Sequence, residues 1–399
     1  MKKTIILTAV VALGALFTSC KDAEYTPLEG QAFIAQTQTR GNAYQTITVG
    51  KSVVSADLNV RLSNVAKKSC SFTVAPDAAA LEKFNKTNST TYVMLPADGY
   101  TITDASDVVT NKLVIEQGQS MSPSLRVNIS PLSEELLETG QKYAVALTIK
   151  NDDNNSTLLP TAKTMVYVID RVVIQPVPVI FNNATTGTQI RGQFGERGIS
   201  FREWTWEANV NMDRLGVGIG QMNNQALLSV NSTNEIYIRF GDAPIDGRVL
   251  QIKTQGTQMN SNMMFTANTW YHLAFACTGN KLYLYVNGEL DNSMDLPDTG
   301  YTLAGTGDAQ DFTIADSGTY FKANMMIAEW RFWTVARSQA EIKNNMYSCD
   351  PKTAGLLGYF KFNEGEGKDY RDATGKGGNA ASLNVPTWVP DVRIDGKSE

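Results

Sequence analysis

Residues 270–288 read WYHLAFACTGNKLYLYVNG. Apolar side chains occupy every second position in two runs of this stretch, which are Leu273, Phe275 and Cys277, then Leu282, Leu284 and Val286. A period of two is typical of β-strands whose two faces meet different surroundings. Residues 278–280 (TGN) tolerate a tight reversal, and the Asn-Gly pair at 287–288 marks a second one. The stretch therefore predicts two strands in the middle of an antiparallel meander.

The same stretch resembles the centre of the laminin-G-like, concanavalin A-like jelly rolls, in which a Trp-x-His strand precedes a strand ending in Tyr-Val-Asn/Asp-Gly. Residues 327–342 (IAEWRFWTVARSQAEI) resemble the penultimate strand and short helix of this family. Residues 357–375 (LGYFKFNEGEGKDYRDATG) resemble its closing strand and the loop that follows. The three matches come in the family's order and span about the length of one all-β domain. The resemblance implies a jelly-roll domain over residues 182–390.

A second set of strand patterns lies in the first half of the chain. Residues 57–62 alternate cleanly, and residues 143–149 (YAVALTI) form a more apolar run of the kind that is buried in a sandwich. A helical pattern follows Pro76-Asp77, where Asp77 suits the N-cap position. These patterns predict an immunoglobulin-like β-sandwich over residues 31–173, which is a normal size for one domain.

This first half also resembles an N-terminal module of Bacteroidetes surface lipoproteins that has no assigned activity. The resemblance rests on residues 81–88 (LEKFNKTN), residues 92–96 (YVMLP) and Tyr100. In that family the module precedes glycan-binding or glycan-cleaving domains. The resemblance implies that residues 31–173 act as a spacer that lifts the jelly roll off a membrane.

Two segments are predicted to lie outside the domains. Residues 174–181 contain Pro176 and Pro178. Because proline has a fixed φ and no N–H, we expect this segment to be a stiff linker rather than a central strand. The polar residues 391–399 are expected to form a mobile tail.

The N-terminus predicts export and lipidation. Residues 1–19 have a positively charged start, an apolar run and small residues at the end, as a secretory signal peptide does. Residues 16–20 (LFTSC) resemble a bacterial lipobox, which implies that Cys20 carries lipid and anchors the protein to the outer membrane. The alternative is an ordinary signal peptide with an incidental cysteine. Residues 21–24 (KDAE), within a tether over residues 20–30, resemble an export signal to the cell exterior or form a solvated spacer.

Charge, histidine and cysteine contents narrow the function classes. The formal net charge is −5 and basic residues do not cluster beyond the first few positions, so nucleic acid is not expected as a partner. A single His and the lack of a Cys-x-x-Cys motif argue against a zinc site. Once Cys20 is lipidated, only Cys277 and Cys349 share a domain and could pair. The alternative is that Cys70, Cys277 and Cys349 are all small buried side chains.

The expected fold class also includes glycan hydrolases, which use two carboxylates a fixed short distance apart. The sequence has no strand that places such a pair on one face. Glu364 and Glu366 come nearest, but they alternate with glycines in a turn. His272 is the only His, and it occupies a family position that resembles a packing site, so we interpret it as structural. We expect a protein without enzyme activity.

Aspartates in the loops raise the question of bound calcium, since laminin-G-like jelly rolls often carry Ca²⁺ at the rim of the sandwich. A hard cation needs several converging oxygen ligands. The predicted ligands are Asp308, Asp311, Asp316 and Asp372. The alternative is that these residues form turns. Ala328 stands where the family commonly has Asp, and this departure speaks against the metal.

Sugar binding needs an exposed aromatic ring beside groups that hydrogen-bond hydroxyls. Trp330 and Trp333 are three apart on one strand, so they face opposite sides, one in the core and the other nearer the surface. The predicted ligand-binding residues are Tyr320, Asp316, Trp388 and Tyr301, with Tyr320 beside the Asp316 loop preferred. Each aromatic residue could instead pack in the core or at an edge.

Lipobox, acidic tether, spacer and jelly roll together lead to one functional hypothesis. We expect a non-catalytic, lectin-like cell-surface lipoprotein of a polysaccharide-utilisation system. Its ligand would be an oligo- or polysaccharide, and a transporter and hydrolases would be its partners. One alternative is an adhesin or assembly protein whose jelly roll binds a host or partner protein, and another is a divergent glycoside hydrolase. Fold alone does not decide among them.

Overall fold

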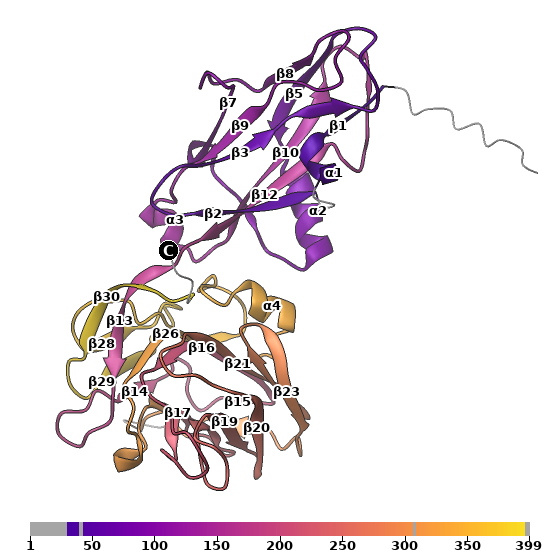
Figure 1. Ribbon diagram of the computed structural model, residues 1–399. Coiled ribbons are helices and arrows are strands. Elements are labelled where there is room, and N and C mark those ends of the chain that lie inside the picture. Colours follow the sequence, from indigo (N-terminus) through magenta and orange to yellow (C-terminus); the bar gives the residue numbers. More distant parts are fainter. Residues whose placement is uncertain (1–29, 40–42, 306–308, 396–399) are drawn as a thin grey trace, which may run out of the picture.

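Only Val172 and Val173 separate the last strand of one sandwich from the first strand of the next. The N-terminal domain ends with β12 (Thr164–Arg171), and the C-terminal domain begins with β13 (Ile174–Ile180). The two domains follow one another along the chain (Figure 1). The predicted all-β class with two sandwiches is confirmed.

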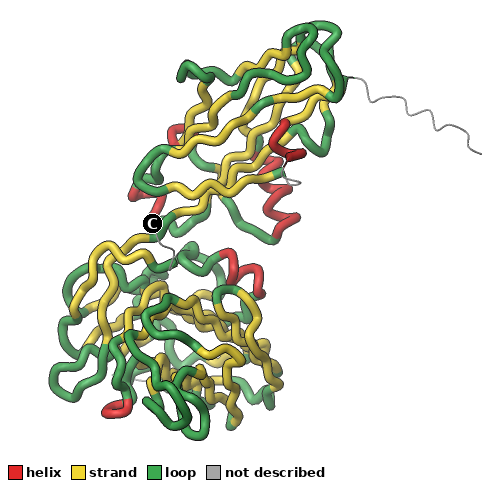
Figure 2. Tube along the Cα trace, in the orientation of Figure 1, coloured by secondary structure: helices red, strands yellow, loops and turns green. Residues whose placement is uncertain are grey.

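The computed structural model describes residues 30–39, 43–305 and 309–395. Strands and loops make up most of these residues, and the helices are short (Figure 2). None of the helices in the described ranges has the length and hydropathy needed to span a bilayer.

Three sheets build the N-terminal domain. The largest runs, in order, β2 (Tyr44–Val49), β12, β10 (Tyr143–Asn151), β5 (Cys70–Pro76) and β8 (Lys112–Ile115), and β6 (Val93–Met94) pairs with β10. The second runs β3 (Val54–Leu58), β9 (Leu125–Ile129) and β7 (Tyr100–Thr103). The third runs β11 (Thr157–Leu158), β1 (Gln31–Ile34) and β4 (Val60–Leu62). The helical segments are α1 (Ala35–Thr39), α2 (Ala78–Asn88), η1 (Ala97–Gly99) and α3 (Glu134–Glu138).

Alternate residues of β10 serve two cores of this domain. Val145, Leu147 and Ile149 face the interior between the sheets. Ala144 and Ala146 point to the opposite side, where α2 covers them. The helix begins as predicted, because the side chain of its N-cap accepts a hydrogen bond from the first turn.

Two eight-stranded sheets face each other in the C-terminal domain. The first runs β23 (Glu289–Asp295), β22 (Lys281–Val286), β21 (Tyr271–Thr278), β16 (Glu203–Met212), β26 (Met325–Trp333), β13 and β30 (Thr387–Arg393), and β27 (Leu356–Phe360) pairs with β26. The second runs β20 (Thr257–Met264), β19 (Val249–Thr254), β18 (Ile236–Phe240), β17 (Gln225–Val230), β25 (Phe312–Ile314), β14 (Ile190–Gln193), β29 (Asn379–Ser382) and β28 (Asp369–Arg371). The remaining elements are β15 (Ser200–Phe201), β24 (Tyr301–Thr302), η2 (Gly318–Tyr320) and α4 (Gln339–Asn344).

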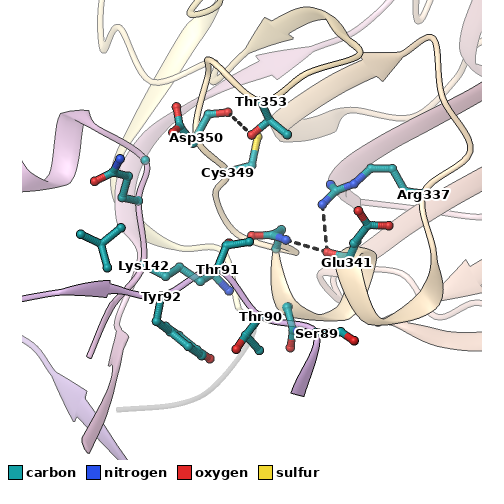
Figure 3. A pocket seen from close by; sticks show the side chains of 15 residues that line it. Ser89, Thr90, Thr91, Tyr92, Lys142, Arg337, Glu341, Cys349, Asp350 and Thr353 are labelled. Carbon is teal, nitrogen blue, oxygen red and sulfur yellow. Dashed lines mark hydrogen bonds between the residues drawn. The ribbon is translucent and has the colours of Figure 1, made fainter. Parts of the chain in front are cut away.

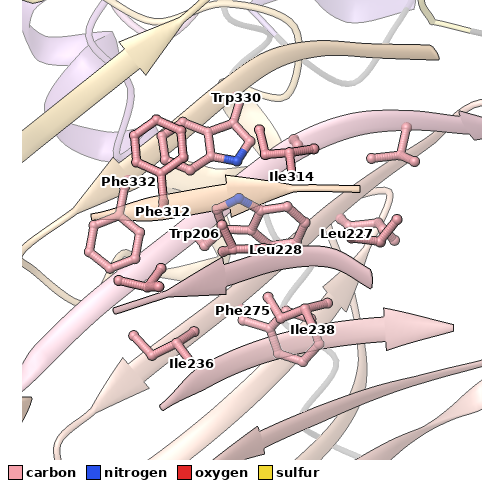
Figure 4. Packing of buried hydrophobic residues seen from close by; sticks show 14 of the residues in the cluster. Trp206, Leu227, Leu228, Ile236, Ile238, Phe275, Phe312, Ile314, Trp330 and Phe332 are labelled. Carbon is pink, nitrogen blue, oxygen red and sulfur yellow. The ribbon is translucent and has the colours of Figure 1, made fainter. Parts of the chain in front are cut away.

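The predicted meander lies in the first of these sheets as β21, β22 and β23. Its second reversal uses Asn287 and Gly288, both at positive φ (52° and 77°), as an Asn-Gly turn requires. The core lies between the two sheets. Trp206 and Trp330 of the first sheet pack there with Phe312 and aliphatic side chains of the second sheet (Figure 4). Helix α4 begins with the predicted capping box.

The predicted linker is wrong, because β13 is an internal strand that pairs with β26 on one side and β30 on the other. The register between β13 and β30 shifts between Gln175 and Val177, which places Pro176 at an irregularity where no ladder hydrogen bond is needed. Pro178 lies opposite Trp388 in the same ladder. Two prolines are therefore accommodated within a sheet.

The predicted tail also differs from the structure. Strand β30 continues to Arg393, and Ile394 is 1% exposed in a small core with Val173 and Val177. Only residues 396–399 of the predicted tail lie outside the described residues. The C-terminal segment is thus part of the domain junction.

One prediction about side chains needs correction, and one open alternative is decided. Trp330 and Trp333 do face opposite sides of β26, but both are buried, because the chain around Cys349 and Leu356 covers Trp333. The cysteines follow the alternative of small buried side chains, because Cys70, Cys277 and Cys349 are all buried and unpaired. Cys277 faces the interior between the sheets, whereas Cys349 lies beyond the outer side of the first sheet.

Candidate functional site

The two sheets of the C-terminal domain differ in what covers their outer sides. Helix α4 packs on the outer side of the first sheet, where Ile342 contacts Ala274 and Ala276. This covered face is turned toward the N-terminal domain, and the second sheet lies on the far side (Figure 1). The outer side of the second sheet, here called the open face, is therefore the larger candidate surface for a ligand.

The open face carries mostly polar side chains, and strand register sets their order. Core residues such as Ile236 and Ile238 alternate with outward ones such as Tyr237 and Arg239. The row that crosses the sheet through the paired positions is Lys253, Tyr237, Ser229, Thr313, Arg191, Ala381 and Asp369. A single strand pattern of alternating apolar and polar residues thus produces a core on one side and a polar surface on the other.

A hydrogen-bonded network occupies one part of this face. The hydroxyl of Tyr237 donates to Asn224 Oδ1 at 2.6 Å. Arg239 donates through Nε and Nη2 to Gln251 Oε1 at 3.2 and 2.7 Å. Gln251 Nε2 donates in turn to Asn260 Oδ1 at 2.8 Å. Arg239 and Gln251 are buried, at 6% and 2% exposure, so they hold the partly exposed Tyr237, Asn224 and Asn260 in fixed orientations from below.

Charge on this part of the open face is locally balanced. Arg239 forms an ion pair with Asp242, and its guanidinium carbon lies 5.4 Å from the centre of the Tyr237 ring. Burial raises the pKa of Tyr237, although Arg239 acts in the opposite direction. The phenol is therefore neutral at physiological pH and can both donate and accept a hydrogen bond.

The rim of the open face is the loop over residues 315–322, which we call the rim loop. Arg191 Nε donates to Asp316 Oδ2 at 3.0 Å, and Ser317 Oγ donates to the carbonyl of Asn224 at 2.7 Å. Asn224 therefore links both parts, because its side chain accepts from Tyr237 while its backbone holds the rim loop. Tyr320 is 61% exposed at the end of this loop.

The predicted ligand-binding residues fall in three places. Tyr320 and Asp316 lie together in the rim loop, at the edge of the open face. Trp388 is half-buried on β30 of the other sheet, where its indole donates to the carbonyl of Gly367 at 3.1 Å. Tyr301 is wrong as a binding residue, because it is 2% exposed and its ring stacks on Phe201 in the core.

The predicted calcium ligands are engaged with protein groups. Asp308 lies outside the described residues. Asp311 is fully buried and accepts from Arg197 Nε at 3.1 Å, and Asp316 is paired with Arg191 as described above. Asp372 accepts from the hydroxyl of Thr374 at 2.7 Å. Within the described ranges, no three His, Cys, Asp or Glu side chains are grouped so that they could hold a metal ion. The calcium site stays a prediction.

The residues considered for catalysis lie in two separate places, Glu364 beside the edge strand β28 of the second sheet and His272 on the first sheet. Glu364 accepts a hydrogen bond from the backbone N–H of Arg371 at 3.0 Å. His272 is 1% exposed on the covered face, and its Nε2 is 3.3 Å from Glu207 Oε2. Burial lowers the pKa of His272, so the imidazole is neutral at pH 7. His272 and Glu207 are both buried, so neither side chain is accessible to a substrate.

A buried charge cluster surrounds His272 and was not predicted. Arg337 Nη1 lies 2.7 Å from Glu207 Oε1, and Arg331 Nη2 lies 3.7 Å from Glu207 Oε2. Burial alone would raise the pKa of Glu207, but the two guanidinium groups hold it well below its usual value. The cluster fastens the covered face to the chain around α4, because Arg331 also donates to the carbonyl of Asn345 at 2.6 Å.

The prediction from sequence also missed Asn224, Tyr237, Arg239, Gln251 and Asn260. The available signal was the alternation in residues 236–240 (IYIRF), where two polar side chains interrupt three apolar ones. That pattern indicates a polar outer side, but only the strand register shows that these residues meet.

Comparisons with known proteins agree with the fold. Residues 186–343 match a family model described as the concanavalin A-like lectin/glucanases superfamily, of laminin-G type, and residues 28–156 match a model described as an N-terminal domain. No curated protein matches the sequence. The C-terminal half therefore carries the concanavalin A-like, laminin-G-type domain that was predicted.

The chain is similar to several solved structures, to different degrees. A candidate carbohydrate-binding protein from Bacteroides ovatus is 21% identical, with a TM-score of 0.60 over 91% of this chain and 99% of that chain. A SAP-like pentraxin from Limulus polyphemus is 9% identical, with a TM-score of 0.36 over 57% of this chain and 99% of its own. EndoBT-3987 from Bacteroides thetaiotamicron, solved with a Man5GlcNAc product, is 19% identical, with a TM-score of 0.29 over 35% and 31%. Only the first likeness is close enough to bear on the whole fold.

Proposed function

We propose that the protein is a non-catalytic glycan-binding protein and that the glycan lies on the open face, against the Tyr237 and Arg239 network and the rim loop. The observation that carries the proposal is the position of Asn224, which ties the network to the loop of Tyr320. The partly exposed amide and hydroxyl groups of Asn224, Asn260 and Tyr237, which the buried Arg239 helps to orient, suit the paired hydroxyls of a sugar. An exposed aromatic ring at the edge suits the apolar face of a sugar ring.

The charge pattern favours binding over hydrolysis. Glycoside hydrolysis needs a carboxylic acid that can give up a proton and a second carboxylate at a fixed separation. Two carboxylates next to the network and the rim loop are paired with arginines, Asp242 with Arg239 and Asp316 with Arg191. Both carboxylates beside the proposed site are therefore engaged with protein groups.

The cellular setting of the proposal comes from the sequence. Cys20 as a lipid anchor, the outer membrane as location, and a transporter and hydrolases as partners are proposals that fit a surface protein of polysaccharide uptake. Cys20 lies outside the described residues. The spacer function proposed for the N-terminal domain is supported by the open face, which is on the side of the C-terminal domain away from the N-terminal domain (Figure 1).

A glycan array tests the proposal. We expect the protein to bind one class of glycan, with and without calcium tested as separate arms. Tyr320→Ala should weaken binding at least tenfold. Tyr44→Ala is the matched control, because Tyr44 is a partly exposed tyrosine of the N-terminal domain.

Three results would contradict the proposal. An array without signal, together with binding to matrix proteins, would favour the adhesin. Equal loss in Tyr320→Ala and Tyr44→Ala would reject the open face as the site. Release of shortened glycan, abolished by a single carboxylate substitution, would show a hydrolase.

A further inference from the structure

A cavity of about 270 Å³ lies between the two domains (Figure 3). The N-terminal domain contributes residues 89–93 and 140–142 to its wall. The C-terminal domain contributes Arg337 and the end of α4, followed by the chain near Asp350. Ligand sites occur preferentially at domain interfaces, where polar groups of two bodies can converge. This cavity is separate from the open face, which belongs to the other sheet.

Polar groups enter the cavity from both walls. Lys142 extends into it from the N-terminal domain, and Arg337 and Glu341 face it from the other side (Figure 3). Hydroxyl and amide groups complete the wall, from Thr91 on one side and Asn344 on the other. Among the described residues, neither the ammonium group of Lys142 nor the side-chain amide of Asn344 has a hydrogen-bond or ion-pair partner. These two groups are therefore available to a ligand.

The carboxylates near the cavity are already in use. Glu341 Oε2 accepts from the backbone N–H and the hydroxyl of Ser338, at 2.8 and 2.7 Å, in the capping box of α4. Asp350 Oδ1 accepts from the backbone N–H of Lys352 at 2.8 Å. Arg337 is committed to the buried Glu207 at 2.7 Å. Among the described residues, Lys142 is thus the charged group of this wall whose side chain has no hydrogen-bond or ion-pair partner, although the charge of Asp170 acts on it.

The surroundings of Lys142 favour an incoming anion. Burial is the main cause that lowers the pKa of Lys142, to about 8, and Asp170 opposes it. Arg331, Arg171 and Arg337 each lower the pKa further, because these guanidinium groups repel the ammonium group. A negative charge beside the ammonium group would offset both the lost hydration and the repulsion.

We propose that this cavity binds an acidic monosaccharide unit, with its carboxylate at Lys142 and its hydroxyls at Asn344, Thr91 and the neighbouring backbone. A single cation accounts for one carboxylate, and the amide and hydroxyl groups account for several hydroxyls. Bound ligand would bridge the two domains. The assignment does not depend on the open face, so either site can fail without the other.

Calorimetric titration of the whole protein tests the proposal with three probes, D-glucuronate, D-glucose and inorganic phosphate. We expect glucuronate to bind at least tenfold more tightly than either of the others. Lys142→Met should reduce glucuronate affinity at least tenfold, and Lys142→Arg should restore part of it. Lys51→Met is the control, because Lys51 is an exposed lysine of the same domain. None of these variants should change glycan binding at the open face.

A second experiment measures how fast the amine of Lys142 is acylated. An amine with a lowered pKa acylates faster near pH 8 than an ordinary lysine, because more of it is unprotonated. Glucuronate should protect Lys142 from acylation and leave Lys51 unchanged, as measured by peptide mapping. If glucose bound as tightly as glucuronate, Lys142 would not recognise the carboxylate. If phosphate bound as tightly as glucuronate, the cavity would recognise an anion and not a sugar. Acylation of Lys142 that is unaffected by glucuronate would overturn the site.

Discussion

Gly140 of the N-terminal domain lies directly against the carbonyl of Cys349 in the C-terminal domain. A Cβ atom placed on Gly140 would come within 2.1 Å of that oxygen. Gly140 also has a φ of +66°, in the left-handed region that favours glycine. The position therefore permits a closer approach of the two domains than any other residue would allow.

Gly140→Ala should loosen the contact between the domains. The added methyl group costs strain at positive φ and also clashes with backbone that cannot move cheaply, so we expect a loss of at least about 2 kcal/mol in the free energy of unfolding. Gly118→Ala is the matched control, because Gly118 has a φ of +85° and open space around its Cβ position. It should lose only about 1 kcal/mol. Denaturant unfolding measures both, and equal losses would show that the contact with Cys349 has no energetic role.

Glu207→Gln should destabilise the C-terminal domain strongly. The substitution leaves Arg331 and Arg337 buried without their counter-charge, and breaking such a group typically costs about 3–5 kcal/mol. Glu289→Gln is the control, because Glu289 pairs with Lys343 at the surface and should change stability by less than about 1 kcal/mol. A Glu207→Gln protein as stable as the control would mean that the arginines find other partners.

Stability should fall between pH 7 and pH 5 because of His272. Its pKa is lowered in the folded protein, mainly by burial and also by Arg331 and Arg337, although Glu207 acts in the opposite direction. The unfolded chain, with an ordinary pKa of about 6.5, then binds more protons than the folded one below that pH. The free energy of unfolding should fall with falling pH, by up to about 1.4 kcal/mol per pH unit.

His272→Gln isolates this effect, because His272 is the only histidine. The variant should show a flatter dependence of unfolding free energy on pH between 7 and 5, whatever its stability at pH 7. An unchanged slope would assign the dependence to other groups.

Gln225→Ala should weaken glycan binding without removing a ligand contact. Gln225 is fully buried and holds the rim loop, since its Oε1 accepts from the N–H of Lys322 at 2.6 Å and its Nε2 donates to the carbonyl of Tyr320 at 2.5 Å. We expect a loss of roughly 1–3 kcal/mol in stability together with weaker binding. Tyr320→Ala should weaken binding and leave stability within about 0.5 kcal/mol. If Gln225→Ala bound glycan as tightly as the unchanged protein, the rim loop would not be part of the binding site.

Local patterns predicted the strands well, because alternation and turn residues act over a few positions. The meander at residues 271–295 and the capping box at Ser338 follow from such short-range chemistry. The linker prediction from Pro176 and Pro178 was wrong for the same reason, because it used only local sequence. Their effect depends on which partner strands they meet and where the register shifts, and neither is visible in one segment of sequence.

The site could be predicted only in part. Tyr320 and Asp316 are close in the chain, so their proximity was accessible from sequence. Tyr301 was misplaced because burial depends on what packs against it, here Phe201 from a distant segment. The link from Asn224 to Tyr237 joins the residue before β17 to strand β18, and it requires a register that no local pattern fixes.

Strand β13 should make the junction between the two domains resistant to a pulling force. The N-terminal domain connects to one end of this strand after only two residues, and the strand pairs with β30 along most of its length and with β26 at Val179 and Ile180. A polymer pulled while bound to the C-terminal domain would load β13 along its own axis. Its backbone hydrogen bonds would then share the force in shear rather than open one after another, and the protein should hold a captured chain against traction without yielding at the joint.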